Sequence, residues 1–246
     1  MRKEKGCKMN KVKVVLFDLD GTLLPMDLDF FIKTYLGMLA EKLKPYGHEP
    51  AKFLAAMWKS TGAMLKNNGE KTNEEVFWET FHAIYEKDIQ GEMPVIDRFY
   101  VEDFDKVREF CGFTPNAARL IEILKRGGFR LAMATNPLFP RIATEKRMAW
   151  AGLSLNDFEL ITTYENSRFS KPNLNYYRAV ADALGVSPEE CLMIGNDVDD
   201  DMPARELGMQ VYLLTDCLIN KSGADLSAFL HGSFEELLDY AEQLIQ

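Results

Sequence analysis

Two carboxylates, Asp18 and Asp20, follow directly on a short apolar run near the start of the chain. Residues 12–17 are mostly hydrophobic and rich in β-branched side chains, which predicts a buried β-strand. Side chains two residues apart at a strand end face the same way, and Gly21 allows a sharp turn there. Open α/β folds build active sites at the carboxyl ends of their strands. Taken alone, the pair fits an active site and a solvated turn equally well.

Polar groups of other kinds stand at the ends of later apolar runs. They are a hydroxyl and an amide (Thr135 and Asn136), an amine (Lys171) and an acidic cluster (residues 197–201). The carboxyl ends of parallel strands lie at one edge of a sheet, so these groups are expected near Asp18. Each is unremarkable by itself, since a lone lysine before proline is usually a surface residue. Their combination in one chain favours the catalytic interpretation.

The elements that must position these groups form an alternating pattern of helix and strand from residue 114 onward. The predicted strands cover residues 12–17, 129–134, 158–162, 192–194 and 209–214. Thr114 followed by Pro115 marks the start of one helix, and Ser233 with Glu236 forms a capping box for the last one. Five strands with intervening helices predict an α/β fold with a doubly wound parallel sheet.

Between the first strand and this alternating region, the hydrophobic period becomes helical. Four apolar stripes are predicted, over residues 28–43, 53–65, 72–85 and 96–110. Thr72 and Glu75 form the capping box of the third stripe. We therefore expect a helical domain over residues 26–111, inserted into a core domain made of residues 10–25 and 112–246.

Composition limits the partners of the protein. The chain has 246 residues, a formal net charge of −9 and an isoelectric point of about 5.0, which argues against binding nucleic acid or an anionic membrane. No run of residues approaches the length of a membrane span, and residues 1–13 lack the apolar stretch of a signal peptide, so we expect a cytoplasmic protein. Four cysteines without metal-type spacing are read as reduced structural thiols: Cys7, Cys111, Cys191 and Cys217.

The order of the motifs resembles that of the haloacid dehalogenase (HAD) superfamily. The matching stretches are Asp18-Leu19-Asp20-Gly21-Thr22, Thr135 after a hydrophobic strand, Lys171-Pro172, and Gly195-x-Asp197-x-x-x-Asp201. The resemblance covers the two segments of the core and implies a HAD-like Rossmannoid sheet. The helical insertion after the first motif resembles the C1-type cap of that superfamily, although its own sequence matches no substrate class.

The resemblance implies a role for each of these residues. Asp18 is the nucleophile that forms an aspartyl-phosphate, and Asp20 protonates the leaving alcohol and then takes a proton from the attacking water. Lys171 supplies positive charge, and Thr135 with nearby backbone N–H groups can hydrogen-bond the transferring oxygens. Asn136 belongs to the same catalytic set. An acid at position 20 resembles the phosphatase branch, because the dehalogenase relatives carry no acid there.

The resemblance also implies a Mg²⁺ ion, which oxygen ligands hold. Its ligands are expected to be Asp18, the backbone carbonyl of Asp20 and an acid of the last motif. Many relatives have Gly-Asp where this chain has Gly195-Asn196, so Asn196, Asp197 and Asp201 all remain candidates. We favour Asp197 as the direct ligand and Asp201 as a supporting acid. The alternative for the whole acidic stretch is a helix start stabilised by the helix dipole.

The expected function is therefore a Mg²⁺-dependent phosphomonoesterase that hydrolyses a small phosphorylated metabolite. A phosphomutase also uses both acids and remains an alternative. A phosphate-binding protein without catalysis, or a phosphoacceptor signalling domain, uses similar groups on a similar sheet. The expected state is a monomer or a homodimer. Residues 199 and 200 are expected to form a solvated turn, and Tyr164, Arg168 and Phe169 to line the entrance of the site.

Overall fold

A six-stranded parallel sheet forms the centre of the protein, with strand order β3-β2-β1-β4-β5-β6. The computed structural model describes residues 12–246, so the predictions for Cys7 and for residues 10 and 11 lie outside the described residues. The strands are β1 (Val14–Phe17), β2 (Arg130–Met133), β3 (Leu160–Ile161), β4 (Cys191–Gly195), β5 (Gln210–Leu214) and β6 (Leu230–Gly232). The predicted α/β fold with a doubly wound parallel sheet is confirmed.

Strand β1 lies in the middle of this sheet, between β2 and β4. All four of its side chains are fully buried, as expected for a short, continuously apolar strand of a parallel sheet. Its last residue, Phe17, is in register with Met133 of β2 and Ile194 of β4. The chain therefore leaves these three strands at the same level, and the residues that follow them share one edge of the sheet.

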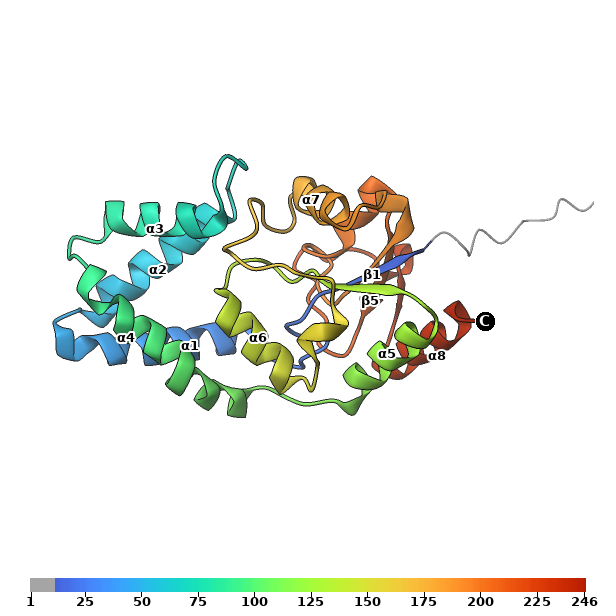
Figure 1. Cartoon of the computed structure of the whole chain (residues 1–246), viewed down its shortest axis with the longest axis horizontal. Helices are drawn as coiled ribbons and strands as arrows, with labels where there is room; N and C mark the ends of the chain where they lie inside the picture. The colour runs from blue at the N-terminus through green and yellow to red at the C-terminus, as the bar shows by residue number, and fades with distance from the viewer. Residues whose placement is uncertain (1–11) are drawn as a thin grey trace, which may run out of the picture.

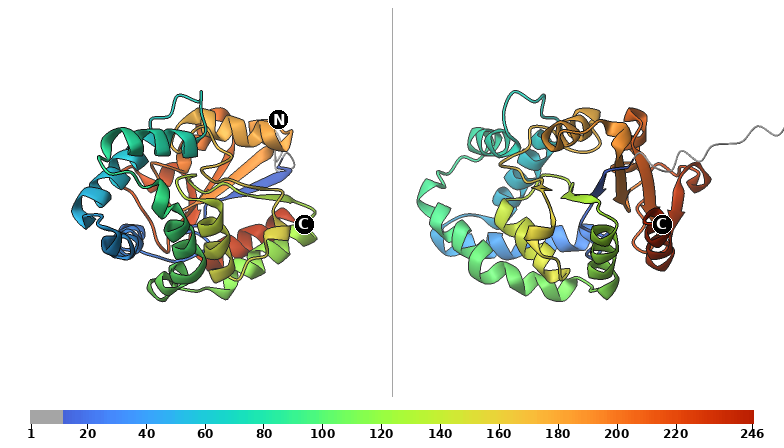
Figure 2. Two further views of the ribbon diagram at one scale, coloured as in Figure 1. Left: turned by 60° about the vertical axis from the view of Figure 1, so that its left-hand side comes forward. Right: turned by 45° about the vertical axis from the view of Figure 1, so that its right-hand side comes forward.

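Helices cover both faces of the sheet (Figures 1 and 2). Val15 and Phe17 of β1 belong to the same buried cluster as helices α5, α6 and α8, whereas Val14 and Leu16 pack with α7. This alternation follows from the two-residue period of a strand. The bounds of these helices are α5 (Pro115–Arg126), α6 (Arg141–Trp150), α7 (Leu174–Leu184) and α8 (Phe234–Leu244).

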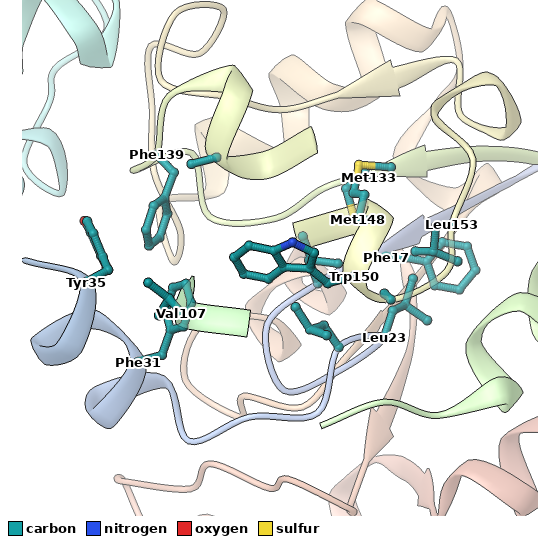
Figure 3. Close-up of a cluster of buried hydrophobic side chains, with 14 of the residues drawn as sticks. Phe17, Leu23, Phe31, Tyr35, Val107, Met133, Phe139, Met148, Trp150 and Leu153 are labelled. Carbon is teal, nitrogen blue, oxygen red and sulfur yellow. The ribbon is translucent and has the colours of Figure 1, made fainter. Parts of the chain in front are cut away.

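The chain between β1 and α5 is helical and lies beyond the carboxyl ends of the strands, at the left of Figure 1. Its helices are α1 (Leu28–Leu43), α2 (Pro50–Met64), α3 (Asn73–Ile84) and α4 (Met93–Arg98). Thr72 and Glu75 form the predicted capping box of α3. We call residues 28–110 the helical segment. Its buried side chains are continuous with those of the core, and Figure 3 shows Phe31 and Tyr35 of α1 facing Phe139 and Trp150.

The structure differs from the predicted elements over one helix and one strand. The fourth helix was expected over residues 96–110, but regular α-helix ends at Arg98 and is followed by π-helix (Phe99–Asp103) and 3₁₀-helix (Phe104–Phe110). Strand β6 was not predicted, because only three residues form it and two of them are exposed at the sheet edge. The cysteines among residues 12–246 are free thiols, as expected, and none of the described helices is long and apolar enough to cross a membrane.

Candidate active site

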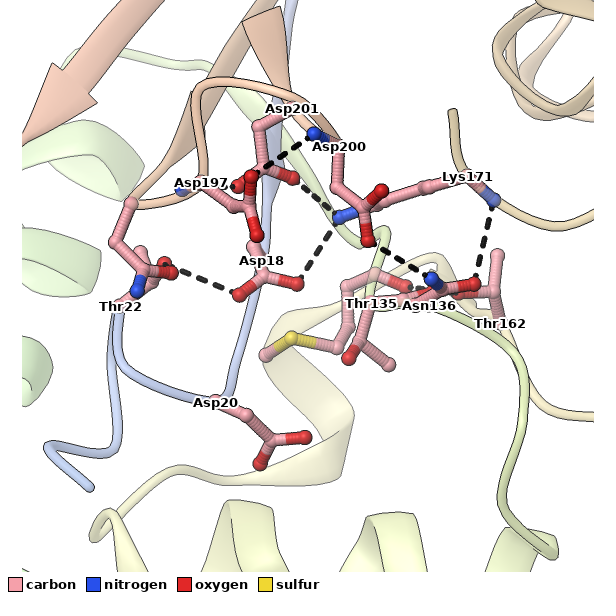
Figure 4. Close-up of polar contacts among 12 residues, drawn as sticks. Asp18, Asp20, Thr22, Thr135, Asn136, Thr162, Lys171, Asp197, Asp200 and Asp201 are labelled. Carbon is pink, nitrogen blue, oxygen red and sulfur yellow. Dashed lines mark hydrogen bonds and ion pairs between the residues drawn. The ribbon is translucent and has the colours of Figure 1, made fainter. Parts of the chain in front are cut away.

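Asp18 lies at the carboxyl end of the central strand, and both oxygens of its carboxylate are held. Oδ1 is 3.0 Å from the Nζ of Lys171, and Oδ2 accepts a hydrogen bond of 3.1 Å from the hydroxyl of Thr22. The backbone N–H of Asp18 donates to the carbonyl of Ile194 in β4, so the ladder of the sheet continues to this residue. Figure 4 shows the side chain pointing toward Lys171 from the strand end.

Lys171 is the buried cation of the site, with 1% of its side chain exposed. Its Nζ lies between two carboxylates, 3.0 Å from Asp18 and 2.6 Å from Asp201. Burial by itself disfavours the charged amine, but the two carboxylates outweigh it and raise the pKa of Lys171 well above its usual value. The two carboxylates therefore hold the buried ammonium group in its charged form.

Asp201 is fully buried and uses both of its oxygens to organise the site. Oδ1 binds Lys171, and Oδ2 accepts a hydrogen bond of 3.0 Å from the backbone N–H of Asp197. Burial raises the pKa of its carboxyl group. A Cβ atom added to Gly195 would lie 2.1 Å from Oδ2 of Asp201, so only glycine fits at the end of β4. Asp201 is therefore shielded from solvent, and its ion pair with Lys171 fixes the position of the lysine side chain.

Thr135 and Asn136 come from the end of β2 and line the same pocket. The amide of Asn136 donates to Oδ2 of Asp200 at 3.1 Å and accepts from the backbone N–H of Lys171 at 3.2 Å. The carbonyl of Thr135 accepts hydrogen bonds from two hydroxyl groups, those of Thr162 and Tyr176. The loop after β2 is therefore bound to the loops that carry the lysine and the acidic cluster.

Residues 196–201 form a compact turn, and their side chains have different hydrogen-bond partners. Oδ1 of Asn196 lies 2.9 Å from the hydroxyl of Thr22, whose single proton it shares with Asp18. The Asn196 amide also donates to the carbonyl of Cys217 at 2.7 Å, which fixes its orientation. Oδ1 of Asp197 accepts from the backbone N–H groups of residues 199 and 200. Asp200 differs from the solvated turn residue that was expected, because it is half-buried and binds Asn136. Sequence reasoning missed it because nothing in the motif distinguishes it from Asp199.

Asp20 lies at the same strand end, but its carboxylate is turned away from Asp18 (Figure 4). It forms a buried ion pair with the guanidinium of Arg147 in α6. Burial raises the pKa of Asp20, against the opposing effect of Arg147, and the nearby Asp18 carboxylate raises it further. Oδ1 of Asp20 is buried without a hydrogen-bond partner. Sequence reasoning missed Arg147 because it lies 127 residues from Asp20, within a helix that otherwise looks like ordinary packing.

The residues present fit a hard divalent cation. Asp18, Asp197 and Asp200 line one pocket, and Asp18 contributes to raising the pKa of both other carboxyl groups after the larger effect of burial. A bound cation that prefers oxygen ligands would reduce the repulsion between these neighbouring carboxylates. Among residues 12–246 no three acidic, histidine or cysteine side chains form a ready-made metal site. Other oxygen ligands, such as the backbone carbonyl of Asp20 or water, would complete the coordination.

A pocket of about 360 Å³ connects these groups. It lies between the strand ends and the helical segment, which contributes Leu28, Ile32 and Leu65 to its wall. Of the expected entrance residues, Arg168 binds the carbonyl of Glu70 and Phe169 packs against Gly69. The structure thus brings the predicted catalytic and metal-site residues together around this pocket, including Asp20, whose carboxylate points to Arg147. Tyr164, Arg168 and Phe169, which were expected at its entrance, do not line it.

Sequence comparison places the chain among known hydrolases. The model of the family described as "haloacid dehalogenase-like hydrolase" matches residues 12–208. Protein SUPPRESSOR OF QUENCHING 1, chloroplastic, of Arabidopsis thaliana is 27% identical over 192 residues, 75% of this chain but only 16% of that protein. A glyceraldehyde 3-phosphate phosphatase of Methanothermobacter thermautotrophicus is 25% identical over 229 residues, covering 88% of this chain and 94% of the relative.

A solved structure shares the fold. The crystal structure of a HAD phosphatase from Thermococcus onnurineus aligns with a TM-score of 0.57 and 20% sequence identity, over 93% of this chain and 97% of the other. The family match covers β1 to β4 and the site residues from Asp18 to Asp201, so the motif order and the geometry agree there. The chain is therefore an enzyme that belongs to the haloacid dehalogenase-like hydrolase family.

Proposed function

We propose that this phosphatase is a Mg²⁺-dependent phosphomonoesterase that works through an aspartyl-phosphate on Asp18. The observation that supports this most directly is the position of Lys171, buried against Asp18 and Asp201 at the pocket floor. A phosphate dianion repels a carboxylate nucleophile, so a site of this kind needs fixed positive charge beside the nucleophile. One relative that aligns over 94% of its length is named a glyceraldehyde 3-phosphate phosphatase. This similarity supports a small phosphate ester as the substrate.

In the first step, an oxygen of Asp18 attacks phosphorus, and the bond between phosphorus and the ester oxygen breaks. The hydrogen bond from Thr22 and the contact with Lys171 hold the carboxylate in one orientation. Such restraint supplies part of the rate enhancement, because the nucleophile is already positioned. Thr135 and Asn136 line the pocket and can hydrogen-bond the transferring oxygens.

Asp20 handles the proton in both steps. As a carboxylic acid it protonates the leaving alcohol, and as a carboxylate it takes a proton from the water that attacks the aspartyl-phosphate, releasing inorganic phosphate. Its carboxylate must leave Arg147 to do so, because the ion pair points it away from Asp18. Repositioning of this side chain is therefore part of the proposed cycle.

A Mg²⁺ ion, when bound, neutralises charge on the phosphate and on Asp18. Asp18, the backbone carbonyl of Asp20 and Asp197 are its proposed ligands. Asp197 has its Oδ1 engaged by the turn, whereas both oxygens of Asp201 are occupied. This difference supports Asp197 as direct ligand and Asp201 as the acid that positions Lys171.

The helical segment is proposed to act as a cap over the pocket, corresponding to a domain of residues 26–111. Its side chains already form part of the pocket wall. A cap in this place would exclude water and contact the alcohol part of the substrate. We further propose that the protein acts in the cytoplasm, as a monomer or a homodimer.

Hydrolysis of p-nitrophenyl phosphate tests the proposal. The wild-type protein is expected to require Mg²⁺ and to lose activity in EDTA. Asp18→Asn should reduce turnover at least about 10³-fold, while the matched control Asp182→Asn, on the exposed face of α7, should not change it. Acid-quenched protein should carry phosphate on Asp18. Unchanged turnover in Asp18→Asn would exclude this residue as the nucleophile.

A further inference from the structure

A second, larger cavity lies beside the catalytic pocket, between the helical segment and α6. Its volume is about 580 Å³, within the range of about 300–1,000 Å³ that is usual for small-molecule sites. Leu138, in the loop after β2, lines both the cavity and the catalytic pocket. The two hollows therefore share a wall, and a molecule whose phosphate lies near Asp18 has this cavity next to it.

The walls of the cavity are aromatic. Six rings line it, and they come from four helical elements and the loop after β3: Tyr35, Phe53, Phe77, Trp78, Tyr100 and Tyr164. Several of these rings are also packed on one another, as Phe77 is on Trp78 with centroids 5.1 Å apart. Such rings offer large apolar surface, and the negative electrostatic potential at their faces attracts cations.

The charges of the cavity are predominantly negative. Four carboxylates line it, those of Glu74, Asp97, Glu145 and Glu165, against a single guanidinium, that of Arg141. That guanidinium is already paired with Glu145. Among residues 12–246, no lysine or histidine lines the cavity. The cavity therefore has uncompensated negative charge beside aromatic rings.

Glu165 is the carboxylate with the clearest need for a partner, whereas Glu74 already accepts a hydrogen bond from Tyr164. Oε1 of Glu165 accepts from the backbone N–H of Arg141 at 2.8 Å, but its Oε2 is buried without a hydrogen-bond partner. Glu74 lies close enough for Glu165 to act on it electrostatically. An unpaired buried carboxylate oxygen costs free energy that a cationic hydrogen-bond donor would recover.

We propose that this cavity is a subsite for the alcohol part of the substrate, and that it selects an apolar or aromatic group carrying one ammonium. The aromatic rings would hold the apolar body, and Glu165 with Glu74 would hold the ammonium. This inference rests on the proposed phosphatase function for the position of the phosphate. It adds the chemical class of the leaving group, which the catalytic residues do not specify.

Binding of three phenols of nearly equal size tests the charge preference without any turnover. The probes are tyramine (cationic), 4-ethylphenol (neutral) and 3-(4-hydroxyphenyl)propanoate (anionic), titrated calorimetrically into the full-length protein. Tyramine is expected to bind about tenfold more tightly than 4-ethylphenol, a difference of about 1.4 kcal/mol, and the propanoate more weakly than both. Equal binding of tyramine and 4-ethylphenol would overturn the proposal.

Matched variants locate the effect. Glu165→Gln and, independently, Glu74→Gln should each reduce the preference for tyramine over 4-ethylphenol about three- to tenfold. The control Glu122→Gln removes a carboxylate from the exposed face of α5, outside the cavity, and should leave the preference unchanged. If both cavity variants keep the wild-type preference, the ammonium is not bound here and the proposal is wrong.

Turnover of matched aryl phosphates connects the cavity to catalysis. The phosphate esters of tyramine and of 4-ethylphenol have similar leaving groups, so a higher kcat/KM for the tyramine ester, about tenfold, reports binding in the cavity. Tyramine should also inhibit hydrolysis of p-nitrophenyl phosphate competitively. Equal kcat/KM for the two esters would overturn the subsite. Absence of p-nitrophenyl phosphate hydrolysis would instead contradict the proposed function, while the calorimetric comparison would still decide the charge preference.

Discussion

Arg147 holds Asp20 in a buried ion pair beneath the catalytic pocket. The guanidinium is completely buried and the Asp20 side chain is 8% exposed. Arg147 also donates to the hydroxyl of Thr144 at 3.2 Å and lies 3.9 Å from the centre of the Phe139 ring. The arginine is thus fixed by its own helix and by the loop after β2. It couples the orientation of Asp20 to the packing of α6.

A double-mutant cycle should show this coupling in stability. Arg147→Met leaves a buried carboxyl without its partner, and Asp20→Asn leaves a buried guanidinium, so each should cost about 3–5 kcal/mol. The double variant leaves no unpaired charge. We expect it to be more stable than the sum of the single effects predicts, by about 1–3 kcal/mol, in urea unfolding followed by circular dichroism.

An exposed pair provides the control for that cycle. Arg126 and Glu242 form an ion pair of 2.9 Å, but 63% and 42% of their side chains are exposed. Exposed pairs are screened by solvent, so the coupling measured for Arg126→Met and Glu242→Gln should be below about 1 kcal/mol. Strict additivity in both cycles would mean that the buried pair does not hold Asp20.

Lys171 is predicted to contribute to catalysis through its charge. Lys171→Met keeps a long apolar side chain but removes the ammonium between Asp18 and Asp201. Loss of one group that stabilises charge in the transition state typically costs about 10²–10³ in kcat, and we expect a loss of this size with p-nitrophenyl phosphate. Lys125→Met, at an exposed pair with Asp157, serves as control and should retain activity. Full activity of Lys171→Met would contradict the proposed role.

The strand ends of the site were predictable from the sequence because local patterns specify them. The apolar runs before Asp18, Thr135 and Asn196 are short and lie next to turn residues, which favours buried strands over helices. Parallel pairing then brings their carboxyl ends together without further information. The position of Lys171 followed only from its order among the motifs.

The contacts that depend on how helices pack were not predictable. Arg147 reaches Asp20 because α6 passes below the turn after β1, and no periodicity in the sequence encodes that approach. The binding of Asp200 to Asn136 depends in the same way on the path of a loop. The π-helix at Phe99–Asp103 also escaped prediction, because its apolar spacing resembles that of an ordinary helix.

Asn73, at the start of α3, is predicted to join the helical segment to the core. It is fully buried, and its Nδ2 donates to the carbonyl of Pro137 at 3.0 Å and to the hydroxyl of Ser170 at 3.1 Å. Asn73→Ala leaves these buried acceptors without a donor and should lower the free energy of unfolding by about 1–3 kcal/mol. Asn68→Ala, at an exposed turn, should cost less than about 0.5 kcal/mol in the same urea titration. Equal effects would show that Asn73 makes no net contribution to this junction.

The preference for an ammonium group in the second cavity should depend on pH. Burial raises the pKa of Glu74 above its usual 4.5, and the carboxylates of Glu165 and Glu75 raise it further, against a hydrogen bond from Tyr164. A raised pKa means that Glu74 takes up a proton at a higher pH than an exposed glutamate does. Tyramine, an amine like that of lysine, stays charged throughout the acidic range. The preference for tyramine over 4-ethylphenol should therefore be complete well above the pKa of Glu74. As pH falls through that pKa the preference should decline, beginning at a higher pH than an exposed glutamate would give.

Calorimetric titration of both phenols across this range measures the effect, since any change common to both reflects the fold rather than the charge. The midpoint of the decline should lie above 4.5, the usual pKa of a glutamate. In Glu74→Gln the remaining preference depends on Glu165, so the decline attributed to Glu74 should disappear. A midpoint at or below 4.5, or the same decline in Glu74→Gln, would show that Glu74 does not bind the ammonium. A preference that stays constant as pH falls from 8 to below 4.5 would likewise exclude a titrating carboxylate in the cavity, because protonation must weaken its attraction for a cation.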